Sequence, residues 1–167
     1  MISLGIDIGL NGALAVVRGD QLLGISDMPT REKPGTSLIR REIDGRALYE
    51  LVLKLVDLGG SEEKITVWLE NVYGMRKGRD GAPQGSASVF SFGDTRGSIR
   101  TVIEVLRLRP EWVAPQSWKR WFKLSPDKNA ARLKALQFYP QADLQRVKDH
   151  NRAESILIAR FGYDRFA

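Results

Sequence analysis

Four of the acidic residues are distinguished from the others by their positions in the sequence: Asp7, Glu70, Asp149 and Glu154. Asp7 and Glu70 each end an apolar, β-rich segment. Charged carboxylates in a sheet core are costly, and two on adjacent strands would repel each other. A divalent cation removes both problems. The other two acids are five residues apart at the start of the last expected helix, so they can converge on the same site.

The donor set selects the kind of cation. The chain has no cysteine and one histidine, which excludes disulfides, thiolate metal sites and a cysteine nucleophile. Carboxylates alone favour a hard ion, so Mg²⁺ or Mn²⁺ fits and zinc does not. Two such ions about 3.5–4 Å apart can position an attacking water and stabilise the leaving oxygen of a phosphodiester.

Each acid taken alone has an ordinary explanation. The strand and turn around Asp7 also resemble the phosphate-binding segment of sugar kinases and actin-like ATPases. Glu70 alone fits a surface acid at a strand end. Asp149 and Glu154 alone fit a helix N-terminal acid and a solvated one. The four together, in this order and on these elements, are much more specific.

The charge of the chain is divided unevenly. Residues 1–95 hold 11 Lys and Arg against 13 Asp and Glu, whereas residues 96–167 hold 15 against 7. A basic half on an otherwise balanced domain is typical of a protein with a polyanionic partner. Solubility alone is the alternative interpretation.

The pattern of apolar residues predicts one α/β domain over residues 1–167. It places a three-stranded antiparallel meander first, then a helix, a parallel strand, a helix, a second parallel strand and three more helices. The expected strands are 2–7, 13–18, 21–27, 65–70 and 112–114, and the expected helices are 43–56, 86–108, 116–122, 127–139 and 150–161. Residues 28–41 and 74–85 are expected to be loops. The resulting sheet is mixed and five-stranded.

Five stretches of the sequence resemble the RuvC family of Holliday junction resolvases, in the phage-type branch that is also similar to the chloroplast resolvase. These stretches are 5–9 (GIDIG), 69–73 (LENVY), 83–93 (PQG to SFG), 113–119 (VAPQSWK) and 149–154 (DHNRAE). Together they span nearly the whole chain.

The resemblance implies an RNase H-like fold and a homodimer that cuts two opposed strands of a four-way DNA junction. It implies that Asp7, Glu70, Asp149 and Glu154 bind the metal and are catalytic. In bacterial members of the family the last two acids lie three apart. In this chain the residue three positions before Glu154 is Asn151, so Asn151, or the neighbouring His150, can share the role of Asp149. The products would carry 5′-phosphate and 3′-hydroxyl ends.

Several residues are candidates for DNA contact. Tyr73 matches an aromatic residue that wedges into the junction in the family, or else it packs beneath its loop. Lys119 and Lys128 match basic positions near the scissile phosphate. A Gly-rich loop after Glu70 offers further phosphate contacts, and Arg152 can contact phosphate or screen the acids. The loop cations are Arg76, Lys77 and Arg79.

Aromatic residues allow two interpretations. Trp118, Trp121 and Phe122 can stack on bases, but their helical spacing favours core packing. The helix around Phe90, Phe92, Ile99 and Val102 is the candidate dimer interface.

Location and rival functions follow from the same residues. No apolar run reaches the ~20 residues that span a bilayer, and no signal peptide is evident. We therefore expect a protein of the cytoplasm, in a bacterial or phage-infected cell or an organelle, with no small-molecule cofactor. The rival functions are an actin-like ATPase, which needs a much longer chain, a non-catalytic junction binder, and an RNase H-like nuclease for other branched DNA or for RNA–DNA hybrids.

Overall fold

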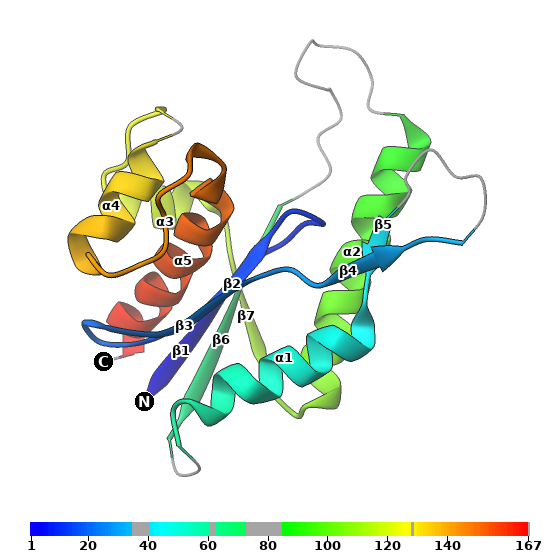
Figure 1. Cartoon of the computed structure of the whole chain (residues 1–167), viewed down its shortest axis with the longest axis horizontal. Coiled ribbons are helices and arrows are strands. Elements are labelled where there is room, and N and C mark those ends of the chain that lie inside the picture. The colour runs from blue at the N-terminus through cyan, green and yellow to red at the C-terminus, as the bar shows by residue number, and fades with distance from the viewer. Residues whose placement is uncertain (35–40, 61–62, 73–84, 128, 167) are drawn as a thin grey trace.

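The structure is a computed structural model that describes residues 1–34, 41–60, 63–72, 85–127 and 129–166. A central sheet separates two groups of helices (Figure 1). On one side lie α1 (Gly45–Asp57) and α2 (Ser86–Val105), and on the other lie α3 (Pro115–Trp121), α4 (Ala130–Phe138) and α5 (His150–Phe166). Alternate residues of the strands face opposite sides of a sheet, so each side has its own apolar core. In β2, for example, Leu14 and Val16 pack with the first group of helices, and Ala15 and Val17 with the second.

The strands of the main sheet are β1 (Ile2–Asp7), β2 (Ala13–Arg18), β3 (Gln21–Asp27), β6 (Ile65–Glu70) and β7 (Pro110–Val113). They lie in the order β3-β2-β1-β6-β7. The pairs β1–β2 and β2–β3 are antiparallel, whereas β1–β6 and β6–β7 are parallel. The prediction of a mixed five-stranded sheet is therefore confirmed.

The helices are α1 (Gly45–Asp57), α2 (Ser86–Val105), α3 (Pro115–Trp121), α4 (Ala130–Phe138) and α5 (His150–Phe166), with a 3₁₀ turn, η1 (Val147–Asp149), before α5. Five expected helices are present. The last one is longer than expected, because the apolar face of α5 continues along the sheet beyond Phe161. Asp44 caps the N-terminus of α1, because its side chain accepts a hydrogen bond of 3.0 Å from the Ala47 amide.

Three expectations need correction. The segment expected as a loop over 28–41 contributes two short strands, β4 (Thr30–Glu32) and β5 (Arg41–Ile43), which pair antiparallel. The helix expected from residue 127 starts later, at Ala130, and Asp127 lies outside it. Its carboxylate accepts from the Asn129 amide at 2.8 Å, and the helix begins after Asn129. In the proposed interface helix, Ile99 is fully buried against the sheet, so it cannot belong to an exposed interface, whereas Phe90 is 71% exposed.

Helix α5 approaches β1 unusually closely at Gly5. A Cβ atom added to Gly5 would lie 2.2 Å from the amide nitrogen of Ala159 and 2.3 Å from the carbonyl oxygen of Ser155. Backbone atoms cannot yield to such an overlap, so only glycine permits this approach. Because Ser155 follows Glu154, the same approach places Glu154 above the end of β1.

We expect Gly5→Ala to destabilise the fold by about 2 kcal/mol or more, since overpacking of this kind forces the backbone apart. Chemical denaturation measures the change. Gly93→Ala is the control, because nothing lies within 4 Å of an added Cβ at that position in α2. That change should stabilise the helix by about 0.5–1 kcal/mol. Equal effects of the two substitutions would contradict the close approach of α5.

Among the described residues, the helices are too short or too polar to cross a lipid bilayer.

Candidate metal centre

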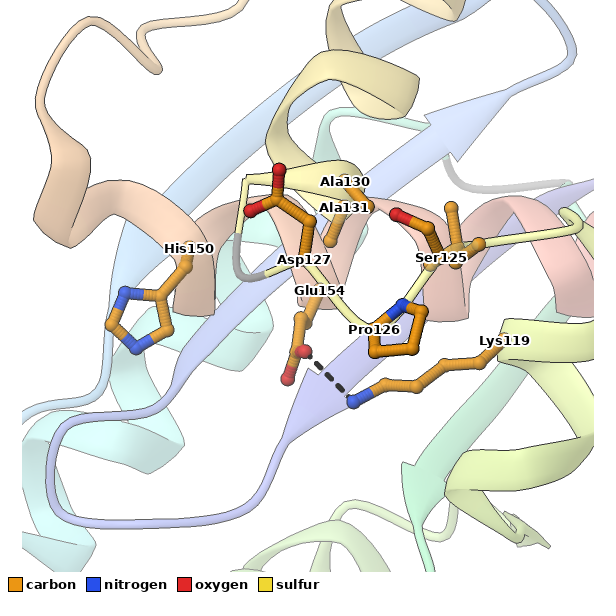
Figure 2. Close-up of a pocket in the computed structure, with 9 residues that line it drawn as sticks. Lys119, Ser125, Pro126, Asp127, Ala130, Ala131, His150 and Glu154 are labelled. Carbon is orange, nitrogen blue, oxygen red and sulfur yellow. Dashed lines mark ion pairs between the residues drawn. The ribbon is translucent and has the colours of Figure 1, made fainter.

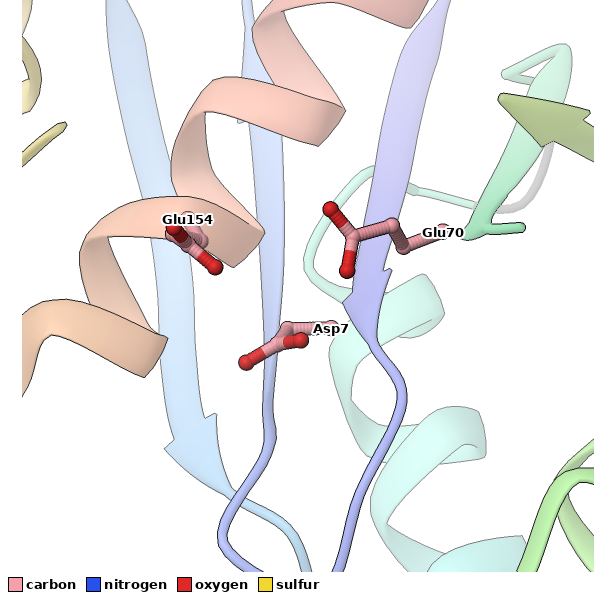
Figure 3. A group of neighbouring side chains, drawn as sticks. All are labelled: Asp7, Glu70 and Glu154. Carbon is pink, nitrogen blue, oxygen red and sulfur yellow. The ribbon is translucent and has the colours of Figure 1, made fainter. Parts of the chain in front are cut away.

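Three of the four acids meet at one edge of the sheet (Figure 3). Asp7 ends β1 and Glu70 ends β6, and these strands are parallel neighbours in which Ile6 pairs with Leu69. Glu154 reaches the same point from the second turn of α5. Each of the three acids offers an oxygen, and these oxygens lie within 4.8 Å of one another. The chain thus brings together carboxylates that are 63 and 84 residues apart in sequence.

The environment of Asp7 disfavours its charged form. The residue is 8% exposed. Burial raises the pKa of this carboxyl well above its ordinary value of 3.8, and the charges of Glu70 and Glu154 raise it further. The nearby Lys119 acts in the opposite direction. Without a cation, the cluster therefore holds its negative charges at a cost in free energy.

Glu70 is buried as well but has a hydrogen-bond donor beside it. The indole Nε1 of Trp118 donates to Oε1 of Glu70 over 2.9 Å, and the Trp118 side chain is completely buried. Burial raises the pKa of Glu70, while the Trp118 hydrogen bond lowers it in part. The expectation that Trp118 packs in the core is confirmed, but its contact with Glu70 was not foreseen.

Glu154 is the most open of the three acids and has a cationic partner. The Nζ of Lys119 lies 3.0 Å from Oε1 of Glu154, with the two side chains 41% and 21% exposed. Both residues line a pocket of about 490 Å³ that also borders Asp127 and His150 (Figure 2). Lys119 therefore stands at the mouth of the acidic cluster, where it can meet an anion arriving from solvent.

Asp149 has a different environment. It is 2% exposed, and its Oδ1 accepts from Nε and Nη2 of Arg146 at 3.0 and 2.8 Å, while Oδ2 accepts from the Arg146 amide. These contacts with Arg146 lower the pKa of Asp149. In the described part of the chain, the cluster of three acids does not include Asp149. Its role as a metal ligand stays a prediction.

The two alternatives to Asp149 have different surroundings. The Asn151 side chain donates to the main-chain oxygen of Asn11, in the loop after β1. His150 is exposed and lines the pocket shared with Glu154.

Arg152 ties α5 to two other segments. Its guanidinium donates to both carboxylate oxygens of Asp27, at 2.6 and 2.8 Å, and to Asp143 at 3.0 Å. The hydrogen bonds from Arg152 lower the pKa of the Asp27 carboxyl. Lys119, and not Arg152, is the cation that acts on Asp7. Contact of Arg152 with DNA stays a prediction.

Most of the predicted DNA-contact residues fall where the structure gives no description. The expectation of core packing is confirmed for Trp118 and Phe122 but is wrong for Trp121, whose side chain is 50% exposed although its ring meets Phe161 edge to face. The candidates outside the described residues are Tyr73, Arg76, Lys77, Arg79 and Lys128.

The residues of the cluster fit a hard divalent cation. All three donors are carboxylates, two of them are buried, and their mutual repulsion is what a cation would relieve. Oxygen ligands of this kind suit Mg²⁺ and Mn²⁺.

Comparison with solved structures identifies the architecture. The structure titled "T. thermophilus RuvC in complex with Holliday junction substrate" aligns with 98% of this chain and 97% of its own, with a TM-score of 0.64 and 16% sequence identity. This chain has the fold of RuvC. A second Thermus thermophilus RuvC structure aligns over 99% of this chain and 96% of its own, with a TM-score of 0.56 and 14% identity. The RuvC fold is RNase H-like, so the expected fold class is confirmed.

The comparisons by sequence, unlike those by structure, give no match. No family model matches the chain, and no curated protein matches it. The correspondence with RuvC therefore rests on the arrangement of the elements.

Proposed function

We propose that this protein is an endodeoxyribonuclease that resolves four-way DNA junctions with the help of Mg²⁺ or Mn²⁺. The observation that carries the proposal is the convergence of Asp7, Glu70 and Glu154 at one edge of an RNase H-like sheet. A carboxylate cluster at that place suits metal-assisted phosphodiester hydrolysis. The RuvC fold adds the choice of substrate, because the aligned structure holds a Holliday junction.

Asp7, Glu70 and Glu154 would hold the cations, with Asp149 joining them if its contact with Arg146 opens. A bound divalent cation supplies Lewis-acid stabilisation of the charge that develops on the phosphate. In the reaction, a water oxygen would bond to phosphorus while the bond to the 3′ oxygen breaks; the water would release a proton to solvent and the 3′ oxygen would take one up, which leaves 5′-phosphate and 3′-hydroxyl ends. The protein contributes position and electrostatics.

Lys119 would bind the scissile phosphate. Its side chain is 41% exposed and its ammonium group lies 3.0 Å from Oε1 of Glu154, so the ammonium can exchange that carboxylate for a phosphate oxygen when DNA enters. Residues 96–167 hold 15 Lys and Arg against 7 Asp and Glu, and these cations would supply further phosphate contacts.

A homodimer belongs to the same proposal. A four-way junction with two-fold symmetry requires two active sites on opposed strands, which a symmetric dimer provides. The exposed apolar residues at the start of α2, Val89 and Phe90, are candidates for part of its contact surface.

Cleavage of labelled substrates tests the proposal. With Mg²⁺ or Mn²⁺, we expect an intact four-way junction to be cut at least about tenfold faster than a linear duplex, a splayed duplex or an RNA–DNA hybrid of the same sequence. Faster cleavage of the hybrid would favour another RNase H-like nuclease. Tight binding of the junction without any cleavage would favour a non-catalytic binder.

A further inference from the structure

Helix α3 contacts two of the three clustered acids through consecutive residues. Trp118 donates to Glu70 over 2.9 Å, and Lys119 lies 3.0 Å from Glu154. The Lys119 ammonium also lies 4.9 Å from the centre of the Trp118 ring. A helix of seven residues that follows β7 thus reaches both the strand acid and the helix acid. The two contacts differ in kind, since Lys119 is partly exposed and Trp118 is not.

The Trp118 hydrogen bond is the more constrained contact. An indole has a single N–H donor, and this one is directed at one particular oxygen, Oε1 of Glu70. Trp118 is 0% exposed and Glu70 is 5% exposed, so water cannot easily replace the donor. The bond therefore fixes the rotation of the carboxylate and leaves its second oxygen for another partner. Hydrogen bonds that orient metal ligands in this way commonly alter metal affinity by about 10- to 100-fold.

We propose that Trp118 is a positioning residue for the metal centre: its side chain holds Glu70 in the orientation that binds a divalent cation. The inference rests on the metal site proposed above, and it assigns to Trp118 a role beyond core packing. Its indole N–H holds Oε1 of Glu70 and thereby presents the remaining oxygen to the ion shared with Asp7 and Glu154.

The chain offers a matched control for this role. Trp68 lies on β6, two residues before Glu70, and is 6% exposed. Its Nε1 is buried without a hydrogen-bond partner among the described residues. Replacement of either tryptophan by phenylalanine removes similar volume from the core, but only Trp118→Phe removes a hydrogen bond to an acid of the cluster.

Isothermal titration calorimetry, with Mn²⁺ added to the DNA-free protein, tests the inference. We expect Trp118→Phe to weaken Mn²⁺ binding by about 10- to 100-fold, while Trp68→Phe changes it by less than about threefold. Binding of a four-way junction in EDTA should be the same for both variants and the wild type, because the Trp118 side chain is completely buried and offers no surface for contact with DNA.

Each outcome decides a different claim. If the wild type binds Mn²⁺ and Trp118→Phe binds it equally well, the role of Trp118 is refuted and the proposed metal site stands. If the wild type binds no Mn²⁺, the metal site fails and this inference fails with it. If Trp118→Phe does not fold, 3-benzothienylalanine at position 118 keeps the bicyclic shape and replaces only the N–H by sulfur. Unchanged Mn²⁺ affinity in that protein would likewise refute the role.

Discussion

Asp7→Asn is expected to abolish cleavage of a four-way junction while junction binding persists. The substitution removes a central carboxylate of the cluster, and we expect the rate to fall at least about a thousandfold, which corresponds to about 4 kcal/mol in the activation barrier. Single-turnover cleavage with saturating protein measures the rate, and a gel-shift assay in Ca²⁺ or EDTA measures binding.

The same substitution should make the metal-free protein more stable. The pKa of Asp7 is raised by burial and by the charges of Glu70 and Glu154, so its ionised form destabilises the fold at neutral pH. Replacement by a neutral amide removes this cost, which we expect to be at least about 1 kcal/mol. Asp57→Asn is the control, because Asp57 is an exposed acid at the end of α1. An Asp7→Asn protein that still cleaves junctions would refute the assignment of the site.

A second prediction concerns how the stability of the folded protein depends on pH and on metal binding. Because the pKa values of Asp7 and Glu70 are raised above 3.8 and 4.5 in the folded protein, the folded state retains protons that the unfolded state has lost. The stability of the metal-free protein should therefore fall, relative to that of Asp7→Asn, as pH rises from about 4 through the raised pKa values. Above these pKa values, the difference in stability between the wild type and Asp7→Asn should stay constant.

Mn²⁺ should reverse this loss at neutral pH. A ligand that binds only the folded state at 100 times its Kd stabilises it by about 2.7 kcal/mol. Thermal unfolding of the wild type and Asp7→Asn, each with EDTA and with Mn²⁺ at several pH values, measures both effects. A Tm of the wild type that is insensitive to Mn²⁺, or one that responds as strongly in Asp7→Asn, would contradict the metal site.

The sequence predicts the sheet and two of its acids well, because both depend on local pattern. Asp7 and Glu70 end apolar β-rich segments, and parallel strands bring their ends to the same edge. Glu154 was found because it precedes an apolar run that had to face the sheet. These signals lie within short stretches of the sequence, so they can be recognised without knowledge of the tertiary structure.

Contacts between distant side chains could not be predicted in the same way. Asp149 has the residue type and position of a metal ligand, but in the structure Arg146 engages its carboxylate. The hydrogen bond from Trp118 to Glu70 joins residues 48 positions apart, and a tryptophan at helical spacing indicates burial without indicating where its N–H points. The strands β4 and β5 were missed because their segment contains two prolines and few apolar residues.

Product mapping on an intact four-way junction is the decisive test of whether this protein resolves junctions with its acidic cluster. With wild-type protein and Mn²⁺, we expect paired nicks in two opposed strands, with 5′-phosphate and 3′-hydroxyl ends that a ligase can seal. The Asp7→Asn protein should give no nicks at any protein concentration that saturates the junction. An uncut junction in the wild-type complex, or equal nicking by both proteins, would contradict the proposed function.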